Sequence, residues 1–356
     1  MNCLLFLLPL SLGLWQDTKS LVWERKISGT YEATLVLKVQ NPGFEGTNWI
    51  VVAPKFPDLP CQKVLIVELS PGKQTLSFEQ NPLKRPFLQT NVMVGAEGLP
   101  KSVTKNQLET KLQAKVELHH RKLVPKRPGF VPKYPFPALK PEEQKPYLRS
   151  TTTVDHDSEE FGRWLKGAKL GRQEGEDDWS VAQRFFLYVR KNIKLRDDTK
   201  TERKASVCAS QKEGNLGAIN ALFVALCRSQ GIPARSLVGR IARSSVYIPN
   251  RAGGGNLNHQ WYLRAEWHHF QLGWIPVDLF LQVTTSTTDL QHLQWFAKDP
   301  GDMIVFHEDF DFLVPAGLFG NKEFPGVDSM SIWSQGVGKL EGQTIQEDWK
   351  VKKIPR

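Results

Sequence analysis

The stretch KEGNLGAINALFVALCRSQGIPAR, from Lys212 to Arg235, decides the fold of this chain. Its glycine-rich start predicts a loop, the apolar run that follows predicts a buried helix, and GIPAR at residues 231–235 predicts a turn into a strand. A cysteine nucleophile often lies at such a loop-to-helix junction, because a helix N-terminus lowers the pKa of a thiol. Leu216 holds that place here. The sequence therefore raises the question of whether the chain is an enzyme without its nucleophile.

The composition is that of an ordinary globular protein. The 356 residues are 40% hydrophobic and 24% charged, so the chain can bury a sizeable core, and its length suggests about two domains. The 47 basic and 37 acidic side chains give a formal net charge of +10. Such a charge can favour anionic partners. Most basic proteins bind none, so we expect a solvated basic surface and no nucleic acid partner.

The N-terminal sequence MNCLLFLLPLSLGLW contains an uncharged apolar run from Cys3 to Trp15. This run is too short to span a bilayer but has the length of a secretory h-region, with the small residues Ser11 and Gly13 near the point of cleavage. No Lys or Arg precedes it, so a buried first strand is an alternative. We predict a signal peptide over residues 1–20, export to the periplasm or the extracellular space, and no transmembrane segment in the mature chain.

The four cysteines, Cys3, Cys61, Cys208 and Cys227, do not form the framework of a disulfide-rich protein, although one bridge is compatible with export. No cluster of Cys and His has the spacing of a zinc site. We therefore expect neither a metal ion nor a cofactor.

Strand and helix patterns divide the chain in two. Residues 21–120 contain several short alternating segments, such as TYEATLVLKV at residues 30–39, which are typical of a β-sandwich domain. Residues 121–149 are rich in proline and basic side chains, and we interpret them as a solvated linker rather than a docking strip for an anionic partner. Residues 150–356 begin with helical periodicity and end in strands, which predicts an α+β domain with a strand-rich C-terminal cover.

Two further segments supply polar residues that suit nucleophilic catalysis. NHQWYLRAEW places His259 at the start of a strand, and GWIPVDLF places Asp278 on the next one. Adjacent antiparallel strands can bring these residues within hydrogen-bonding reach, and the helix that starts near Leu216 would face them. A nucleophile, a base and a residue that orients the base have this layout. Each piece alone has a structural explanation, but their order and spacing make the set specific.

Together these segments resemble the transglutaminase-like superfamily, whose core is related to papain-like cysteine proteases. The resemblance extends from Tyr147 to Thr284 and rests on the GIPAR turn, the His-x-Trp at His259 and the Gly-Trp-x-x-x-Asp that ends at Asp278. It implies an α+β, papain-like fold preceded by an N-terminal β-sandwich. The family cysteine falls on Leu216. The resemblance thus implies that the nucleophile is absent and that His259 and Asp278 are a vestigial catalytic pair.

Four further residues are candidates for the site around Leu216. Cys208 lies eight residues before it and is an alternative nucleophile. We expect three side chains to line the groove beside Leu216: Asn220, one helical turn later, and Trp261 and Trp274 on the strands. Both tryptophans have an alternative interpretation as core aromatics that brace the strands.

A leucine cannot form a thioester, because its side chain has no lone pair and no ionisable proton. We therefore predict an exported protein that is catalytically inactive and binds a protein or peptide-like ligand in the retained groove. The alternative is an active cysteine hydrolase or acyltransferase, of the peptidase or transglutaminase type, with a displaced nucleophile such as Cys208. A third interpretation is a structural or scaffold protein of the cell envelope, in which the β-sandwich carries the function. The sequence leaves the oligomeric state open.

Overall fold

The computed structural model describes most of the chain. The described residues are 21–95, 97, 103–104, 106–127, 138–196, 202–243, 247–248, 255–256, 261–284, 293–315, 320–327, 332–335, 337, 339 and 342–355. The predicted signal peptide, His259 and the central part of the predicted linker lie outside these residues.

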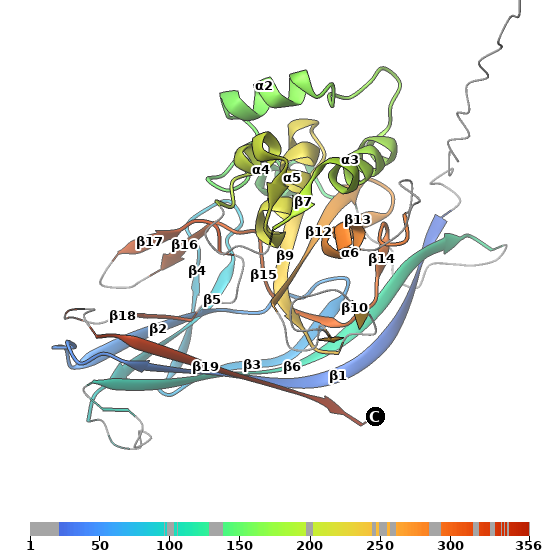
Figure 1. Ribbon diagram of the computed structural model, residues 1–356. Coiled ribbons are helices and arrows are strands. Elements are labelled where there is room, and N and C mark those ends of the chain that lie inside the picture. The colour runs from blue at the N-terminus through green and yellow to red at the C-terminus, as the bar shows by residue number, and fades with distance from the viewer. Residues whose placement is uncertain are drawn as a thin grey trace, which may run out of the picture.

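Two antiparallel sheets form a sandwich that contains most of the N-terminal part of the protein (Figure 1). The first sheet is built on a long strand pair and comprises β1 (Leu21–Gln40), β6 (Gln107–Pro125), β3 (Gln62–Ser70), β14 (Lys298–Asp299) and β19 (Thr344–Ile354). The second sheet has the order β18 (Trp333–Gln335), β2 (Asn48–Pro54), β5 (Pro86–Met93) and β4 (Gln74–Phe78).

The alternation of side chains explains why β1 forms a strand. Its buried residues face the core between the sheets and occupy every second position: Tyr31, Ala33, Leu35, Leu37 and Val39. The residues between them are half-buried or exposed. Val51 and Ala53 of β2 contribute to the same core from the second sheet. The predicted β-rich N-terminal region is therefore confirmed.

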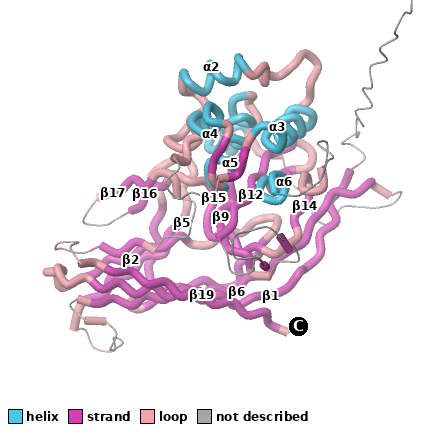
Figure 2. The backbone as a smooth tube through the Cα atoms, viewed as in Figure 1, coloured by secondary structure: helices cyan, strands magenta, loops and turns pink. Residues whose placement is uncertain are grey.

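The second module packs helices against a four-stranded antiparallel sheet. The sheet has the order β13 (Gly273–Val277), β12 (Trp261–His269), β9 (Ala234–Ile241) and β15 (Met303–Glu308). The helices gather at one end of the molecule in Figure 2 and are α2 (Glu159–Gly167), α3 (Asp178–Asn192), α4 (Ala205–Gln211), α5 (Leu216–Ser229) and α6 (Leu279–Thr284). The predicted α+β fold class is confirmed.

Short elements connect these layers. They are α1 (Pro141–Gln144), η2 (Lys145–Tyr147), β7 (Lys194–Leu195), β8 (Glu213–Gly214), β10 (Tyr247–Ile248), β11 (Gly255–Asn256), β16 (Phe312–Pro315) and β17 (Asn321–Phe324). Among the described residues, no helix combines the length and the apolar character needed to cross a bilayer.

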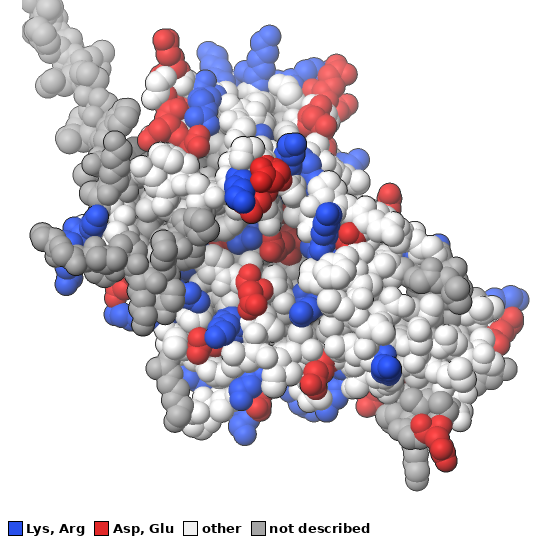
Figure 3. All heavy atoms as spheres, turned by 180° about the vertical axis from the view of Figure 1, so that it is seen from behind, with Lys and Arg blue, Asp and Glu red and all other residues white. Residues whose placement is uncertain are grey.

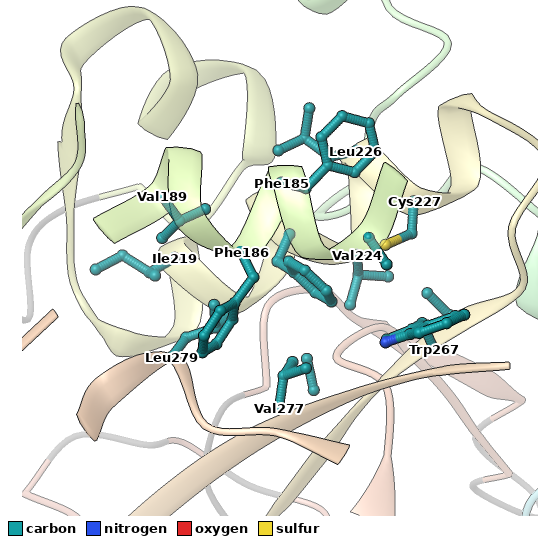
Figure 4. Packing of buried hydrophobic residues seen from close by; sticks show 14 of the residues in the cluster. Phe185, Phe186, Val189, Ile219, Val224, Leu226, Cys227, Trp267, Val277 and Leu279 are labelled. Atoms are coloured by element: carbon teal, nitrogen blue, oxygen red, sulfur yellow. The ribbon is translucent and has the colours of Figure 1, made fainter. Parts of the chain in front are cut away.

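Helix α5 is the centre of the second module. All of its residues from Gly217 to Arg228 are buried, which is the pattern of a helix surrounded by protein. Figure 4 shows Phe186 of α3 and Val224 of α5 packed above Val277 of β13. The burial of α5 therefore fixes the position of its N-terminal residue, Leu216.

The two modules are not separate cores joined by a solvated linker. Leu21, Trp23 and Cys61 of the N-terminal part belong to the core cluster around α5. The indole Nε1 of Trp23 donates a hydrogen bond to the carbonyl oxygen of Leu272, at 2.7 Å. Strand β6 continues to Pro125, so the segment predicted as a linker begins inside the sheet.

The C-terminal segment also differs from the predicted cover of the second domain. β19 pairs with β1 along its whole length, from Ile354 opposite Thr30 to Thr344 opposite Gln40, and β18 pairs with β2. The C-terminal strands therefore complete the N-terminal sandwich. Thr344 and Gln40 are 304 residues apart, and pairing over such a distance leaves no local signal in the sequence.

Candidate functional site

The N-terminus of α5 is capped by its own sequence. Asn215 is the N-cap residue, and its Oδ1 accepts a hydrogen bond from the backbone N–H of Ala218 at 2.9 Å. Leu216 is the first residue of the helix, and its half-buried side chain packs against the main core. A side chain at this place stands at the positive end of the helix dipole.

Gly214 shapes the approach to this helix. A Cβ atom at Gly214 would lie 2.9 Å from the Cβ of Ala218 and 3.0 Å from the Sγ of Cys208. Both distances are too short for an ordinary contact, so glycine is needed here. Cys208, on α4, therefore packs against the backbone just before the helix.

Asn220 lies one turn into α5 and is fully buried. Its Nδ2 donates a hydrogen bond to the carbonyl oxygen of Leu216 at 2.9 Å. Its Oδ1 has no hydrogen-bond partner among the described residues. A buried acceptor without a partner costs stability, so we expect its donor to lie outside the described residues.

Asp278 follows β13 directly and caps α6. Its Oδ1 accepts a hydrogen bond from the backbone N–H of Leu281 at 3.0 Å. The hydroxyl of Tyr262 lies 2.7 Å from Oδ1 and 2.9 Å from Oδ2, and the Nε of Arg264 donates to Oδ2 at 3.0 Å. The buried carboxylate is thus held by three donors from three different residues.

The register of β12 and β13 explains which residues meet Asp278. Ala265 stands opposite Val277, so the next position along the ladder brings Arg264 beside Asp278. Tyr262 is two residues further along the same face. In a catalytic triad the base is the residue that binds the orienting carboxylate. Among the described residues, Tyr262 is the side chain in that place.

Tyr262 is a poor substitute for a histidine base. Burial, and then the negative charge of Asp278, raise the pKa of Tyr262 well above its ordinary value. The phenol therefore stays protonated at neutral pH and donates its proton to the carboxylate. His259, the predicted base, lies outside the described residues, and its pairing with Asp278 stays a prediction.

Trp261 packs in a different core from Leu216. Its ring centroid is 5.5 Å from that of Phe306, and the guanidinium of Arg240 lies 4.0 Å from the ring. These contacts place Trp261 with the sandwich cluster, whereas Leu216 packs against the cluster around α5. The structure therefore supports the interpretation of Trp261 as a bracing aromatic and not as a neighbour of Leu216.

Trp274 is also a packing residue, with 8% of its surface exposed. The guanidinium of Arg235 lies 3.9 Å from its ring, and the ring of Tyr147 meets it edge-on at 4.8 Å. Its carbonyl oxygen accepts a hydrogen bond from Arg121 at 3.1 Å. Neither predicted tryptophan is therefore placed to line a groove together with Leu216 and Asn220.

The three described cysteines are buried and form no disulfide. Burial raises the pKa of the Cys208 thiol to about 12 and raises the pKa values of Cys61 and Cys227 as well. The thiolate is the nucleophilic form of cysteine, and these thiols stay protonated at neutral pH. The surroundings of Cys208 thus provide none of the activation that a displaced nucleophile needs.

A buried network of ion pairs, which the sequence analysis did not identify, connects the second sheet to the sandwich. Glu266 on β12 forms ion pairs with Arg121 on β6 and with Arg235 on β9, the latter at 2.6 Å. Arg235 also pairs with Glu308 on β15 at 2.9 Å. The available signal was the sequence YLRAEW, where two charged residues interrupt an otherwise apolar strand. One set of ion pairs therefore connects four strands, which come from both modules.

Arg264 is the second centre of this network. It contacts Asp278, Asp302 at 2.7 Å and Asp299 at 3.3 Å. Burial alone would lower the pKa of Arg264, but the three carboxylates together raise it. Asp278 therefore belongs both to the candidate site and to this buried network of ion pairs.

Metal and anion sites find little support in the described residues. No group of three or more His, Cys, Asp or Glu in this part of the chain is arranged to hold a metal ion. Three surface pockets bounded by described residues have volumes of about 290, 470 and 250 Å³, and none of the three is lined by the four predicted groove residues. On the face shown in Figure 3, basic and acidic side chains are interspersed.

The central part of the chain matches a known family. Residues 168–279 match the family model of the transglutaminase-like superfamily. This range contains Leu216, Tyr262 and Asp278, so it includes all three positions of the candidate site.

One solved structure shares the fold at low sequence identity, and a second aligns more weakly. The structure of a candidate cysteine protease from Cytophaga hutchinsonii aligns with a TM-score of 0.52 and 13% identity, over 94% of each chain. The periplasmic domain of TgpA from Pseudomonas aeruginosa aligns with a TM-score of 0.35 and 13% identity, over 67% of this chain and 89% of that domain.

One curated relative matches a shorter segment. An uncharacterized protein from Haemophilus influenzae is 33% identical over 76 residues, which are 18% of this chain. The match spans 21% of the length of that relative.

Proposed function

Because residues 168–279 form a transglutaminase-like domain, we propose that this chain is an exported, non-catalytic protein of that superfamily that binds a protein or peptide-like ligand at the N-terminus of α5. The observation that carries the proposal is Leu216 at the first position of the helix. The resemblance places the cysteine of the family at this position. Export rests on the apolar run from Cys3 to Trp15.

The geometry supports the loss of catalysis at the N-terminus of α5. Acyl transfer by this fold needs a thiolate at the helix N-terminus and a base that accepts its proton. Leu216 offers no ionisable group, and Tyr262 gives its proton to Asp278 instead of accepting one.

The rival function, an active cysteine enzyme with a displaced nucleophile, is disfavoured by Cys208. This thiol is 1% exposed, and burial raises its pKa to about 12. An acyl substrate would need to reach a buried sulfur that carries a proton at neutral pH.

The binding function is supported by what remains at the helix terminus. Leu216 is half-buried and offers an apolar contact, and the helix dipole favours electron-rich groups such as a peptide carbonyl. A peptide provides apolar side chains and carbonyl oxygens within a single ligand.

The test of inactivity compares the wild-type protein with Cys208→Ala. We expect no hydrolysis of fluorogenic peptide amides, no incorporation of an amine into a glutamine-containing peptide, and no labelling of the folded protein by iodoacetamide. Turnover by the wild type that disappears in Cys208→Ala would refute the proposal and establish the rival.

The test of binding uses fluorescein-labelled extended peptides and fluorescence polarisation. We expect Leu216→Lys to abolish binding, because a charge would replace the apolar contact at the positive end of the helix. Leu76→Lys is the matched control, since Leu76 lies on β4 of the sandwich and is 50% exposed. Equal loss of binding in both variants, or unchanged binding in Leu216→Lys, would place the ligand elsewhere.

A further inference from the structure

Strand β19 forms a long edge of the first sheet of the sandwich. It has 11 residues and pairs with β1 on one side (Figure 1). No other described strand pairs with its opposite side. Backbone N–H and C=O groups along that side are therefore available to another strand.

The two faces of β19 differ in character. Trp349 stands opposite Leu35 and Ile345 opposite Val39, so the odd-numbered residues lie on the face of the sandwich core. The even-numbered residues Gln346, Asp348, Lys350 and Lys352 lie on the outer face. Along the strand, the acidic residues come first and the basic residues follow, as in TIQEDWKVKKI.

We propose that β19 is a dimerisation edge that pairs, antiparallel, with β19 of a second copy of this chain. Antiparallel pairing lays the acidic first half of one strand on the basic second half of the other. Parallel pairing would instead place like charges side by side. The segregation of charge along β19 therefore selects both the partner and its direction.

Charge also selects the register. Residues that stand opposite each other must share a face of the sheet, so both are odd-numbered or both are even-numbered. The two-fold axis that relates the two copies therefore passes through a residue and not between two residues. An axis at Trp349 sets Asp348 of each copy opposite Lys350 of the other. An axis at Asp348 or at Lys350 would set that residue opposite its own copy, and like charges in direct opposition are destabilising.

A pocket beside the edge, partly lined by apolar side chains, supports this assignment. It has a volume of about 290 Å³ and lies between the edges of the two sheets, lined in part by Leu37, Val39, Trp333 and Ile345. Ile345 is 61% exposed. With the axis at Trp349, Lys353 of the second copy stands opposite Ile345, and its aliphatic stem covers the apolar surface at the pocket mouth.

Charged edges can also serve to prevent strand pairing, and the two roles make different predictions. A protective edge needs only charge, in any order. A dimerisation edge needs complementary charges at specific positions. The exchange of Asp348 and Lys350 separates these roles, because it keeps the composition and the complementarity while each single substitution removes the complementarity.

The test is analytical ultracentrifugation of the full chain over a range of concentrations. We expect a reversible dimer with a dissociation constant on the order of micromolar, which weakens as salt is added. Asp348→Lys and Lys350→Asp should each weaken the dimer by about tenfold or more, and the double variant should restore it. Gln346→Glu, which faces Lys352 of the second copy, should strengthen the dimer.

Lys166→Asp is the control, because it makes the same change of charge as Lys350→Asp on the exposed face of α2. It should leave the dimer unchanged. A protein that is monomeric at all concentrations would overturn the proposal, as would a dimer that neither single variant weakens. Circular dichroism of each variant confirms that the chain is folded.

Discussion

The hydroxyl of Tyr262 lies 2.7 Å from Oδ1 of Asp278, within a buried contact between β12 and the residue that follows β13. In a nucleophile, base and orienter arrangement, this is the contact that a base makes. The phenol donates in that contact and cannot take a proton from a thiol. Among the described residues, the side chain beside Asp278 therefore cannot act as the base of a cysteine enzyme.

Tyr262→Phe should lower the free energy of unfolding by about 2 kcal/mol, because it removes one donor from a buried carboxylate. Arg264 and the backbone N–H of Leu281 still hold Asp278, so the fold should persist. Urea denaturation followed by tryptophan fluorescence measures the change.

Tyr188→Phe is the matched control for this substitution. Tyr188 is half-buried on α3, and its hydroxyl has no hydrogen-bond partner among the described residues. Removal of that hydroxyl should change the free energy of unfolding by less than about 0.5 kcal/mol. An equal effect in both variants would mean that the bond between Tyr262 and Asp278 contributes nothing specific.

Leu216→Cys with Tyr262→His should produce a reactive thiol. Cysteine alone at position 216 gains only the stabilisation of its thiolate by the helix dipole. A histidine in the place of Tyr262 can in addition form an imidazolium beside that thiolate, so the pH at which half of the thiol is labelled should fall by about one unit or more. The rate of iodoacetamide labelling as a function of pH measures this shift.

Leu216→Cys with His259→Ala decides between the two candidate bases. If His259 reaches Asp278 as the sequence predicts, this variant should label more slowly at neutral pH than Leu216→Cys alone. If Tyr262 occupies the only place beside the carboxylate, the two variants should label alike. Cys208→Ala serves as the background, so that every label reports position 216.

The helical half of the candidate site could be predicted from the sequence, while the strand half could not. The glycine-rich loop and the apolar helix after Leu216 are consecutive, and their consequences are local. The partner of Asp278 depends instead on the register of β12 and β13, in which Ala265 stands opposite Val277. A short motif such as His-x-Trp does not contain that register.

Arg121→Met should destabilise the whole protein by about 3 kcal/mol, because it leaves Glu266 with Arg235 as its remaining ion-pair partner and removes the bond to the carbonyl of Trp274. Since each of the two main core clusters contains residues of both modules, thermal unfolding should stay a single transition at a lower temperature. Differential scanning calorimetry measures both features.

Lys122→Met tests the neighbouring position. The side chain of Lys122 is 46% exposed and pairs with Glu24 at 3.3 Å on the surface. Its substitution should change the stability by less than about 0.5 kcal/mol. Two separate transitions in Arg121→Met would show that the modules unfold independently once this ion pair is lost.

The stability of the protein should decrease as the pH falls below about 6.5, in part because of His268. Burial, and then the positive charge of Arg235, lower the pKa of His268 to about 4. The unfolded chain therefore binds a proton at a higher pH than the folded chain does. The contribution of His268 to stability is complete above the unfolded pKa and is lost as the pH falls toward 4.

His268→Gln isolates this contribution. Other groups titrate over the same range, and Asp302, whose pKa is raised by burial, acts with the opposite sign. The difference between the wild type and the variant in urea denaturation should therefore change steadily from pH 7 to pH 4. A difference independent of pH would show that His268 has the same pKa in both states.

The tryptophans show a second limit of inference from sequence. Trp261 and Trp274 belong to the motifs that carry the resemblance, so their assignment to the groove followed from their neighbours in the chain. Trp261 instead packs on Phe306, and Trp274 packs on Arg235. Both contacts involve strands that are distant in sequence, and only the assembled sheet defines them.

The pairing of β19 with β1 has a consequence for how the chain is made. Gln40 leaves the ribosome long before its neighbour Thr344, which follows 304 residues later. During that time one edge of β1 has no partner strand, and the sandwich is incomplete. The N-terminal module is therefore the first to be synthesised and the last to be completed. A chaperone that holds the nascent chain open would protect that exposed edge.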